Sequence, residues 1–502
     1  MASGTPPTYQ LRGWFIPGSW EETAATFASW AMVVSGNYSW EELGSGLVPN
    51  DDVLGCAFSR ELSTFAQRLS IGQGQIELDN SRGQYTSGAN QISINDIVSL
   101  KGIYPTSVYG VFRGRVESTE ANPDLAQRTM LVSLSDAARD LMRPVRTGFM
   151  EGTISSSVYQ HICNLSGFTD ATLVVDPANR DPIPFAYFEE VPGGEGVWQI
   201  QQPNLTNVFT DRFGRLRIVD RNYDVSSVVA GSYNAFYSFA VIEDQASIIN
   251  RSDITIQPRQ RSLDVGTIGF LQQPLFIAAQ ATKEFSIQYL DPSNLDGNTP
   301  CTNVQTPVPG LDYFFNTSPD GRGTDITSAV GFVLDIGALY TKVTATNSGS
   351  DNGYFSAFQL RGNWFGRVPQ ITVTQINSLS RDAYSEVPYA LTTEFIASQF
   401  TADALAAWQI SRYRQPEPTI EFGLNDEFPD VLDRDMLDLV WLINSETNVS
   451  SGFRIASVTH ELDFSAGLQH SVTYRGVQEY RKTYFILDSS ADGRLNVNRL
   501  GY

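Results

Sequence analysis

The chain has 502 residues, which is too long for one ordinary hydrophobic core and suggests about three or four domains. Hydrophobic residues make up 41% of the chain and aromatic residues 12%, a content that excludes a disordered polypeptide. The net charge of −21 argues against a nucleic-acid groove or an anionic membrane surface as the main partner.

The composition favours strands and loops over helices. Charged residues are only 18% of the chain, whereas Gly, Ser, Thr, Asn and Tyr are plentiful. No apolar run approaches the length that spans a bilayer, and residues 1–15 contain no charged-then-apolar signal sequence. Cys56, Cys163 and Cys301 are odd in number and widely spaced, which argues against a disulfide framework. We therefore expect a protein made in a reducing cytoplasm, without stable membrane insertion.

Residues 1–150 are dominated by strand patterns. In the stretch GQIELDNSRGQYTS, at residues 74–87, polar residues alternate with Ile76 and Leu78, and an Asn-Ser-Arg-Gly corner follows. Strict alternation predicts a half-buried strand, and the corner supplies the residues that end it. Residues 129–142 begin as a strand and become helical, with Ser135 as the expected N-cap. We predict one antiparallel β domain, a small barrel or sandwich.

The rest of the chain divides into four further segments. Residues 151–225 are predicted to form a small α/β module, because the apolar residues of SSSVYQHICNLSGF have helical spacing and short strands follow this stretch. Within residues 226–265, the stretch 246–257 is predicted to be a strand leading out of this module, and residues 266–375 resemble a β-sandwich with Gly/Asp/Asn corners. Residues 376–502 predict more strands and one helix at 401–414. Its inward side chains are expected to be Ala404, Leu405 and Trp408, and Pro416 should end it.

The order of these segments is similar to that of tail-tip hub proteins of tailed bacteriophages, also called minor tail proteins. LDNSRGQYTS, INDIVSLKGI, VFRGRVES and MLVSLSDAARDLM resemble the N-terminal half of that family. Further segments follow in family order, namely HICNLSGF, TDRFGRLRIVDR, IINRSDI, FQLRGNWF, DAYSEVPYALTTEF, TADALAAWQISRYRQPEP and FRIASVTHELDFSAGLQHSVTYRG. The first 35 or so residues and residues 266–350 match least.

The resemblance implies a fold and a set of partners. Family hubs are homotrimers in which each chain supplies two similar β-barrels, so that the ring has six near-equivalent surfaces for a sixfold tail tube or distal tail ring. The implied division is a first hub barrel at 1–150, the α/β module at 151–225, a second hub barrel at 226–265 and 376–502, and the inserted sandwich at 266–375. Implied partners are the distal tail ring or tail tube protein, the tape measure protein, other tail-tip or receptor-binding proteins, and genomic DNA only in transit. The implied location is the phage tail tip, after synthesis in the host bacterial cytoplasm.

Few residues predict catalytic chemistry. We find no GxSxG, HExxH, Gly-rich phosphate loop or papain-like cysteine motif, and we predict a protein that is not an enzyme, with no catalytic, cofactor-binding or metal-binding residue and no cofactor. His161 falls within a predicted helix, while His460 and His470 lie on facing strands of the closing hairpin, where ordinary strand roles are favoured over metal binding.

An acidic segment and two aromatic groups leave alternatives open. Residues 417–438 carry eight carboxylates against Arg434, and a solvated acidic loop is favoured over a cation site or a glycosidase-type carboxylate pair. In a trimer lumen these carboxylates would repel passing DNA. Aromatic groups suit core packing or stacking on sugars; their members are Trp14, Trp20, Trp30, Trp40, Tyr354, Phe355, Phe358, Trp364 and Phe365. The alternative functions are therefore a carbohydrate-binding receptor-recognition protein and a glycoside hydrolase.

Overall fold

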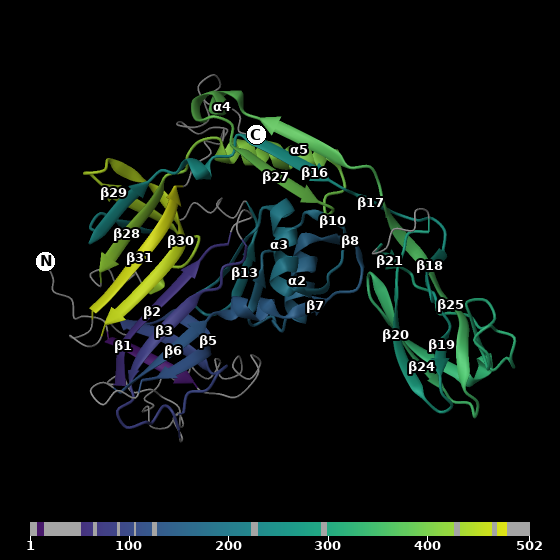
Figure 1. Cartoon of the computed structure of the whole chain (residues 1–502). Helices are drawn as coiled ribbons and strands as arrows, with labels where there is room; N and C mark the ends of the chain where they lie inside the picture. The colour runs from purple at the N-terminus through teal and green to yellow at the C-terminus, as the bar shows by residue number, and fades with distance from the viewer. Residues whose placement is uncertain are drawn as a thin grey trace.

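In the computed structural model, strands are the main regular element of the described residues and helices are few, as the sequence predicts. It describes residues 8–14, 52–63, 68–87, 91–104, 107–122, 128–221, 229–292, 299–425, 432–463 and 469–478. Figure 1 shows a large curved sheet on the left, a module with two helices in the centre, and a separate β module on the right. Within the described residues, no helix has both the length and the apolar character needed to cross a membrane.

Six strands from the first part of the chain form one antiparallel set, in the order β1-β4-β5-β6-β3-β2. Their bounds are β1 Thr8–Trp14, β2 Val53–Glu61, β3 Gln73–Asp79, β4 Ile97–Tyr104, β5 Ser107–Ala121 and β6 Thr129–Ser135. β3 is the predicted alternating strand, and Ile76 and Leu78 are buried in the core while their neighbours face outward. The alternation was informative because this strand has one face in the core and one in solvent.

Six strands from later in the chain form a second set, in the order β14-β29-β30-β31-β28-β15. Their bounds are β14 Val229–Tyr233, β15 Ser238–Ile242, β28 Thr419–Asn425, β29 Leu439–Asn444, β30 Val449–Asp463 and β31 Gln469–Gln478. The long strand β30 also pairs with β2 over Ser457–Asp463, which joins the two sets into one sheet of 12 strands.

Both sets curl strongly. Phe58 on β2 and Phe112 on β5 have ring centroids 4.8 Å apart, although β3 and β6 lie between these strands in the sheet order. Three flat strand spacings would be about 14 Å. β14 and β15 are the outermost strands of the second set, yet the linker 234–237 between them can reach at most about 17 Å, against about 24 Å for five flat spacings. Each set therefore wraps around its own hydrophobic cluster.

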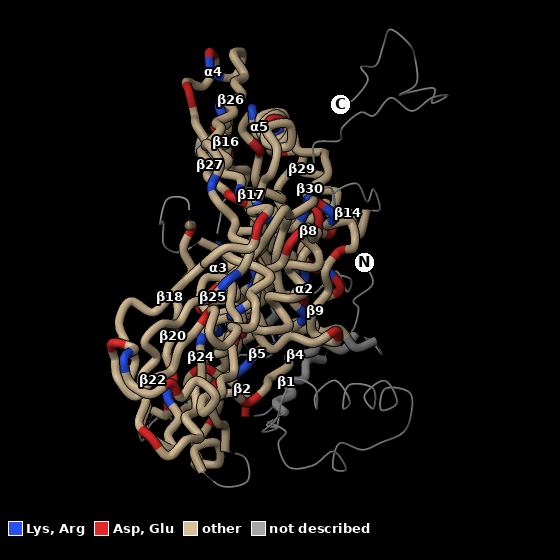
Figure 2. Tube along the Cα trace, turned by 90° about the vertical axis from the view of Figure 1, so that its right-hand side faces the viewer, with Lys and Arg blue, Asp and Glu red and all other residues tan. Residues whose placement is uncertain are grey.

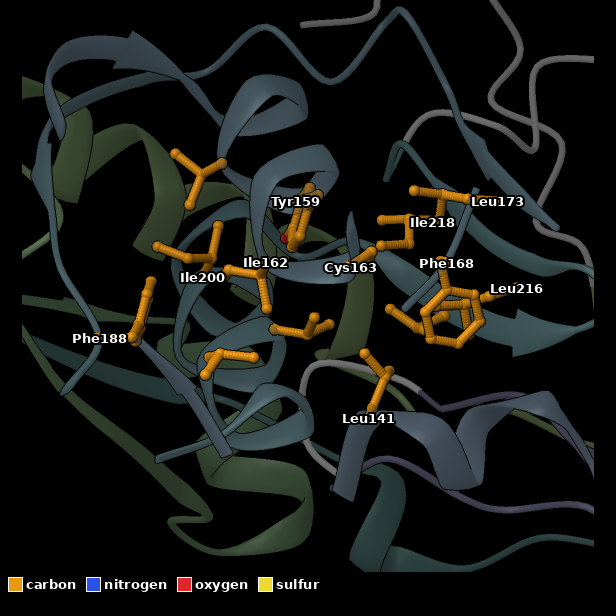
Figure 3. Packing of buried hydrophobic residues seen from close by; sticks show 14 of the residues in the cluster. Leu141, Tyr159, Ile162, Cys163, Phe168, Leu173, Phe188, Ile200, Leu216 and Ile218 are labelled. Atoms are coloured by element: carbon orange, nitrogen blue, oxygen red, sulfur yellow. The ribbon is translucent and has the colours of Figure 1, made fainter. Parts of the chain in front are cut away.

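The central module lies against the first set and contains two packed helices, α2 (Ser155–Leu165) and α3 (Gly193–Asn204). Around them lie the 3-10 helix η3 Ala137–Met142 and the strands β7 Pro144–Arg146, β8 Met150–Ile154, β9 Leu173–Val175, β10 Pro182–Ala186, β11 Glu189–Pro192, β12 Asn207–Thr210 and β13 Leu216–Val219. Figure 3 shows Tyr159, Ile162 and Ile200 directed into a common core, which confirms the helix predicted near residue 158.

Two details of this module differ from the sequence predictions. The N-cap of η3 is Asp136 and not Ser135, because the Asp136 carboxylate accepts a hydrogen bond of 2.9 Å from the Ala138 amide. Helix α3 was not predicted, since it begins with glycines that usually disfavour helices. Here a Cβ on Gly193 would collide with Ser166 Oγ, so glycine permits the close approach of α3 to the end of α2.

A third layer joins segments on either side of the sandwich. Strands β16 (Arg251–Ile256), β26 (Ile371–Ile376) and β27 (Pro388–Thr393) form a sheet in the order β26-β16-β27, with the 3-10 turn η5 Gln245–Ser247 and helix α4 Ser378–Tyr384 nearby. Helix α5, Gln399–Tyr413, packs on this sheet and is capped by Ser398, whose hydroxyl accepts a hydrogen bond from the Thr401 amide. Of the predicted inward residues, Leu405 is buried and Trp408 is half-buried against the cluster, but Ala404 is exposed, so the prediction is wrong for Ala404. The other buried positions are Ala402, Ala406, Gln409 and Ile410.

The β module on the right of Figure 1 is inserted between the paired strands β16 and β26. Its two sheets enclose a core of aromatic and aliphatic side chains, including Phe315, Phe355 and Val343. One sheet is centred on the long strand β25, and the other has the order β20-β24-β23. The bounds are β17 Arg259–Arg261, β18 Gly266–Phe270, β19 Leu275–Ile277, β20 Thr282–Gln288, β21 Cys301–Thr302, β22 Tyr313–Asn316, η6 Thr327–Ala329, β23 Val330–Ile336, β24 Tyr340–Asn347 and β25 Gly353–Arg367.

Candidate functional site

The acidic segment 417–438 is largely folded into the protein where the structure describes it. Glu417 is buried and forms an ion pair of 3.2 Å with Arg412. Burial raises the pKa of the Asp438 carboxyl, which accepts a hydrogen bond from the Asp435 amide at 2.9 Å. The prediction of solvated carboxylates is therefore wrong for Glu417, Asp435 and Asp438, which are buried or half-buried, whereas Glu421 and Asp433 are exposed. Asp426, Glu427 and Asp430 lie outside the described residues.

Arg60 is the centre of a buried charged junction between the two sets of strands. It lies on β2, its side chain is 3% exposed, and its Nη1 contacts Asp435 Oδ1 at 2.7 Å. The same nitrogen donates to the backbone carbonyl of Thr210 at 3.2 Å. This guanidinium therefore contacts a loop of the second set and the end of β12 in the central module. An Arg–carboxylate pair shielded from water holds its partners in one geometry.

Arg212 adds a second basic group to this junction. Its backbone amide donates to Asp435 Oδ2 at 3.0 Å, and its Nη2 contacts Asp433 Oδ1 at 2.6 Å. Arg212 is positioned by a tight turn between β12 and β13, in which the buried Asp211 accepts hydrogen bonds from the Phe213 and Arg215 amides. Gly214 closes this turn with φ of +77°, a conformation that L side chains rarely adopt.

Asp136 is a buried carboxyl close to the same junction. Burial raises the pKa of Asp136 to about 6, from an ordinary value of 3.8. Hydrogen bonds from the Gly72 and Ala138 amides, together with the positive charge of Arg60, oppose this rise but do not cancel it. Desolvation is the larger effect because a charged carboxylate loses its water shell in the interior.

The junction is suited to joining parts of the chain. A glycosidase-type pair needs one protonated carboxyl and a second one free to attack or to activate water. Asp433 and Asp435 are instead each held by an arginine from another part of the chain. Figure 2 shows acidic and basic positions distributed along the described chain. Asp433 and Asp435 therefore give the hydrolase hypothesis no support.

The histidines do not form a metal centre in the described part of the chain. His161 is exposed on α2, and His460 is buried on β30 opposite Val472. His470 pairs with Leu462, so both hairpin histidines have the predicted facing-strand positions, but the His470 side chain lies outside the described residues. Among described residues, no three His, Cys, Asp or Glu side chains are grouped to hold a metal ion. The three cysteines are buried and unpaired with one another.

The aromatic residues of the sandwich mostly pack in its interior. Phe355 and Phe358 are core residues with centroids 5.2 Å apart, as the core-packing interpretation predicts. Phe365 packs against Phe149 of the central module, with centroids 4.4 Å apart. Tyr354 and Trp364 are half-buried. The side chain of Trp14 and all of Trp20, Trp30 and Trp40 lie outside the described residues.

A second charged contact, which sequence reasoning missed, attaches the sandwich to the central module. Arg146 on β7 contacts Glu189 Oε2 at 3.1 Å and Asp335 Oδ2 at 2.5 Å, and its guanidinium lies over the Tyr340 ring at 4.6 Å. Glu189 also accepts a hydrogen bond from the Ala338 amide. The tip of the β23–β24 hairpin is thereby fixed against β7 and β11. No local pattern signals this contact, because Arg146 and Asp335 are 189 positions apart.

Comparisons with known proteins find no match by sequence and matches of low identity among solved structures. No protein-family profile matches the sequence, and no curated protein matches it. Solved structures with a similar arrangement include a 43 kDa tail protein of prophage MuSo2 from Shewanella oneidensis, with 12% identity, a TM-score of 0.48, and coverage of 87% of this chain and 96% of that one.

Two further solved structures have a similar arrangement and comparably low sequence identity. A tail protein from Neisseria meningitidis has 9% identity and a TM-score of 0.48, with coverage of 84% of this chain and 92% of that chain. A prophage tail protein from Listeria monocytogenes has 8% identity and a TM-score of 0.40, with coverage of 88% and 94%.

Proposed function

We propose that this chain is a structural virion protein, the trimeric hub at the tail tip of a tailed bacteriophage. Three copies would adapt a sixfold tail tube or distal tail ring to a threefold tip and help to close or gate the DNA channel. The proposed location is the virion tail tip. Proposed partners are the distal tail ring or tube protein, the tape measure protein and other tail-tip proteins, with DNA present only in transit.

The observation that carries this proposal is the pair of curled six-stranded sets in one chain. The first set comes from residues 8–135 and the second from residues 229–242 and 419–478, and they are joined through β2 and β30. Three such chains would present six sets around an axis, which matches a sixfold partner without requiring six identical subunits. The ordered sequence segments that resemble tail-tip hubs are an independent support.

The charged junction fits this role. Arg60 and Arg212 connect the first set and the central module to the loop 432–438 of the second set. A ring subunit must keep its two sets at a fixed spacing if both are to meet equivalent surfaces. The proposed division is a first hub barrel at 1–150, the α/β module at 151–225, a second barrel unit at 226–265 and 376–502 that carries β16, β27 and α5 beside its six strands, and the inserted sandwich at 266–375.

The test is the mass of the purified full chain and its place in the virion. A hub should give particles of three times the chain mass in light scattering and threefold density beneath a sixfold ring in images of the tail tip. A chain that is monomeric at all concentrations and absent from purified virions would refute the proposal.

A carbohydrate-binding role is a second candidate, because the outer face of the β25 sheet exposes aromatic rings. Phe270, Phe276 and Phe314 are 40–49% exposed. They pair across the sheet with Gln359, Tyr354 and Ala357 of β25. Exposed rings beside polar side chains suit stacking on sugars. The wild-type chain should bind host surface glycans, and Phe276→Ala, which leaves the core of the sandwich unchanged, should lose that binding. No binding by the wild-type chain would contradict this role.

A further inference from the structure

The edge strand β15 is unusually exposed for an apolar strand. It pairs with β28 on one side, and among the described strands it has no neighbour on the other. Its residues Val241 and Ile242 are adjacent, so they point to opposite faces, yet they are 40% and 41% exposed. Tyr237, directly before the strand, is 47% exposed. Phe239 is half-buried against Phe236 and the cluster of the second set, whereas Ala240, Val241 and Ile242 are not covered by the described part of the chain.

The features that normally protect sheet edges are absent from this segment. Residues 229–242, VAGSYNAFYSFAVI, contain no charged residue and no proline. Natural edge strands usually carry charges, proline or bulges that prevent pairing with another chain. The only such feature in the described pairing is a register shift in β14 between Val229 and Gly231. An unprotected apolar edge of this kind is a template for strand addition.

The charge of the chain indicates which partner fits this edge. Copies that each carry a net charge of −21 repel one another over most of their surfaces. A contact between copies therefore requires a strip with few carboxylates. Residues 229–242 contain none, and the nearest are Glu243 and Asp244, which follow the strand, and Glu421 opposite Ala240 on β28. The opposite end of the same 12-stranded sheet is β1, which among the described strands pairs only with β4 and whose single charged residue is Arg12.

We propose that β15 of one copy pairs with β1 of the next copy and forms the seam between subunits. The contact is head-to-tail, since it joins different edges of identical chains, and such contacts generate closed rings when the rotation between copies permits. This inference rests on the proposed trimer, because it names the surface through which three copies meet. The twelve-stranded sheet of each chain would continue into the next, and the apolar side chains of β15 would be covered.

The test compares two valine-to-aspartate variants of the full chain. Val241→Asp places a carboxylate in the seam, whereas the control Val333→Asp places one on β23, where Val333 is 71% exposed at the edge of a three-stranded sheet in the sandwich. The trimer should dissociate at least tenfold more readily in Val241→Asp than in the wild type, and should be unchanged in Val333→Asp. Light scattering over a dilution series measures this, and circular dichroism verifies that both variants are folded.

The outcomes separate this inference from the proposed function. A wild-type trimer that Val241→Asp leaves intact overturns the seam but not the hub, and a wild-type chain that never trimerises overturns both. If Val241→Asp does not fold, hydrogen exchange of the wild-type chain decides the matter. The amides of 238–242 and 8–14 should then exchange more slowly at trimer-forming concentrations than after dilution. Equal exchange at both concentrations contradicts the seam.

Discussion

Arg60 and Asp435 are 375 positions apart in the chain, yet their side chains meet at 2.7 Å. Separations of this size explain why the acidic segment was misjudged from sequence. Read alone, residues 432–438 have more carboxylates than local cations, which predicts a solvated loop. The arginines that neutralise them lie on β2 and in the β12–β13 turn, and only the tertiary fold brings them there. The sequence shows that this segment is acidic, but it does not show which arginines pair with the carboxylates.

Replacing Arg60 with methionine should destabilise the fold. Arg60→Met keeps much of the side-chain volume but leaves Asp435 without its partner in a water-poor junction, which costs about 2–4 kcal/mol of unfolding free energy. The control is Arg322→Met, because Arg322 is 89% exposed and its contact with Asp320 is 3.8 Å long. That surface pair should contribute less than about 0.5 kcal/mol. Urea unfolding measures both, and equal stability of the two variants would contradict a structural role for the junction.

The pKa of Asp136 predicts a pH dependence. Because burial raises the pKa of this carboxyl to about 6 in the fold, against an ordinary 3.8, the folded state favours the protonated form. The stability that this protonation contributes is complete below pH 3.8 and is lost as the pH rises through 6. Asp136→Asn mimics the protonated form, so it should be more stable than the wild type at pH 8, by about 1–3 kcal/mol.

The difference between Asp136→Asn and the wild type should shrink as the pH falls to 5. Urea unfolding of both proteins at pH 5, 6.5 and 8 measures it. Because both proteins share every other titrating group, comparing them at each pH isolates Asp136. A variant less stable than the wild type at pH 8 would mean that the ionised carboxylate is favoured in the fold, contrary to the direction of its pKa.

At the scale of elements, patterns with one buried face were predictable and close packing was not. The alternation of β3 and the spacing of α2 both follow from a single face in the core. Helix α3 depends on glycines that fit against Ser166 and Phe188, and a glycine run carries no signal of that fit in the sequence. For α5, alanines lie on both the inward and the outward face, so the composition alone could not place the apolar stripe.

The corrected face of α5 gives a prediction for two neighbouring positions. Leu405 is 6% exposed in the cluster formed with β16, β26 and β27, so Leu405→Ala should cost about 2–4 kcal/mol through lost contacts and a cavity. Ala404 is exposed, so Ala404→Gln, which keeps a good helix former, should change stability by less than about 0.5 kcal/mol. Thermal unfolding of both variants measures this. Strong destabilisation by Ala404→Gln would instead indicate that Ala404 lies on the inward face of α5, as the sequence predicted.

At the scale of the whole molecule, the sandwich joins the rest by two chain crossings and by contacts with the central module. One crossing leads from β16 into β17, and the other leads from β25 into β26. β16 pairs with β26, and β17 pairs with β25. Arg146, the Phe149–Phe365 pair and the Arg259–Glu394 ion pair of 2.8 Å then fix its orientation. The sequence predicted a separate β-rich segment here, but it gave no information on this orientation, because residues from distant segments determine it.

Arg146 should control how firmly the sandwich is attached. Its guanidinium joins Glu189, Asp335 and the Tyr340 ring, so Arg146→Met removes the charge that holds the hairpin tip while each module keeps its own core. We expect faster hydrogen exchange at the Ala338 amide, which donates to Glu189, and a broader distance distribution in small-angle scattering. The matched control is Lys342→Met on the neighbouring strand β24, whose pair with Glu284 lies within the sandwich at 2.7 Å. Both variants lose one cation that pairs with a carboxylate of the sandwich, but only Arg146→Met breaks a contact between modules. If Arg146→Met and Lys342→Met give the same scattering and exchange, the remaining contacts, such as Phe149–Phe365 and Arg261–Glu151, are enough to hold the sandwich in place.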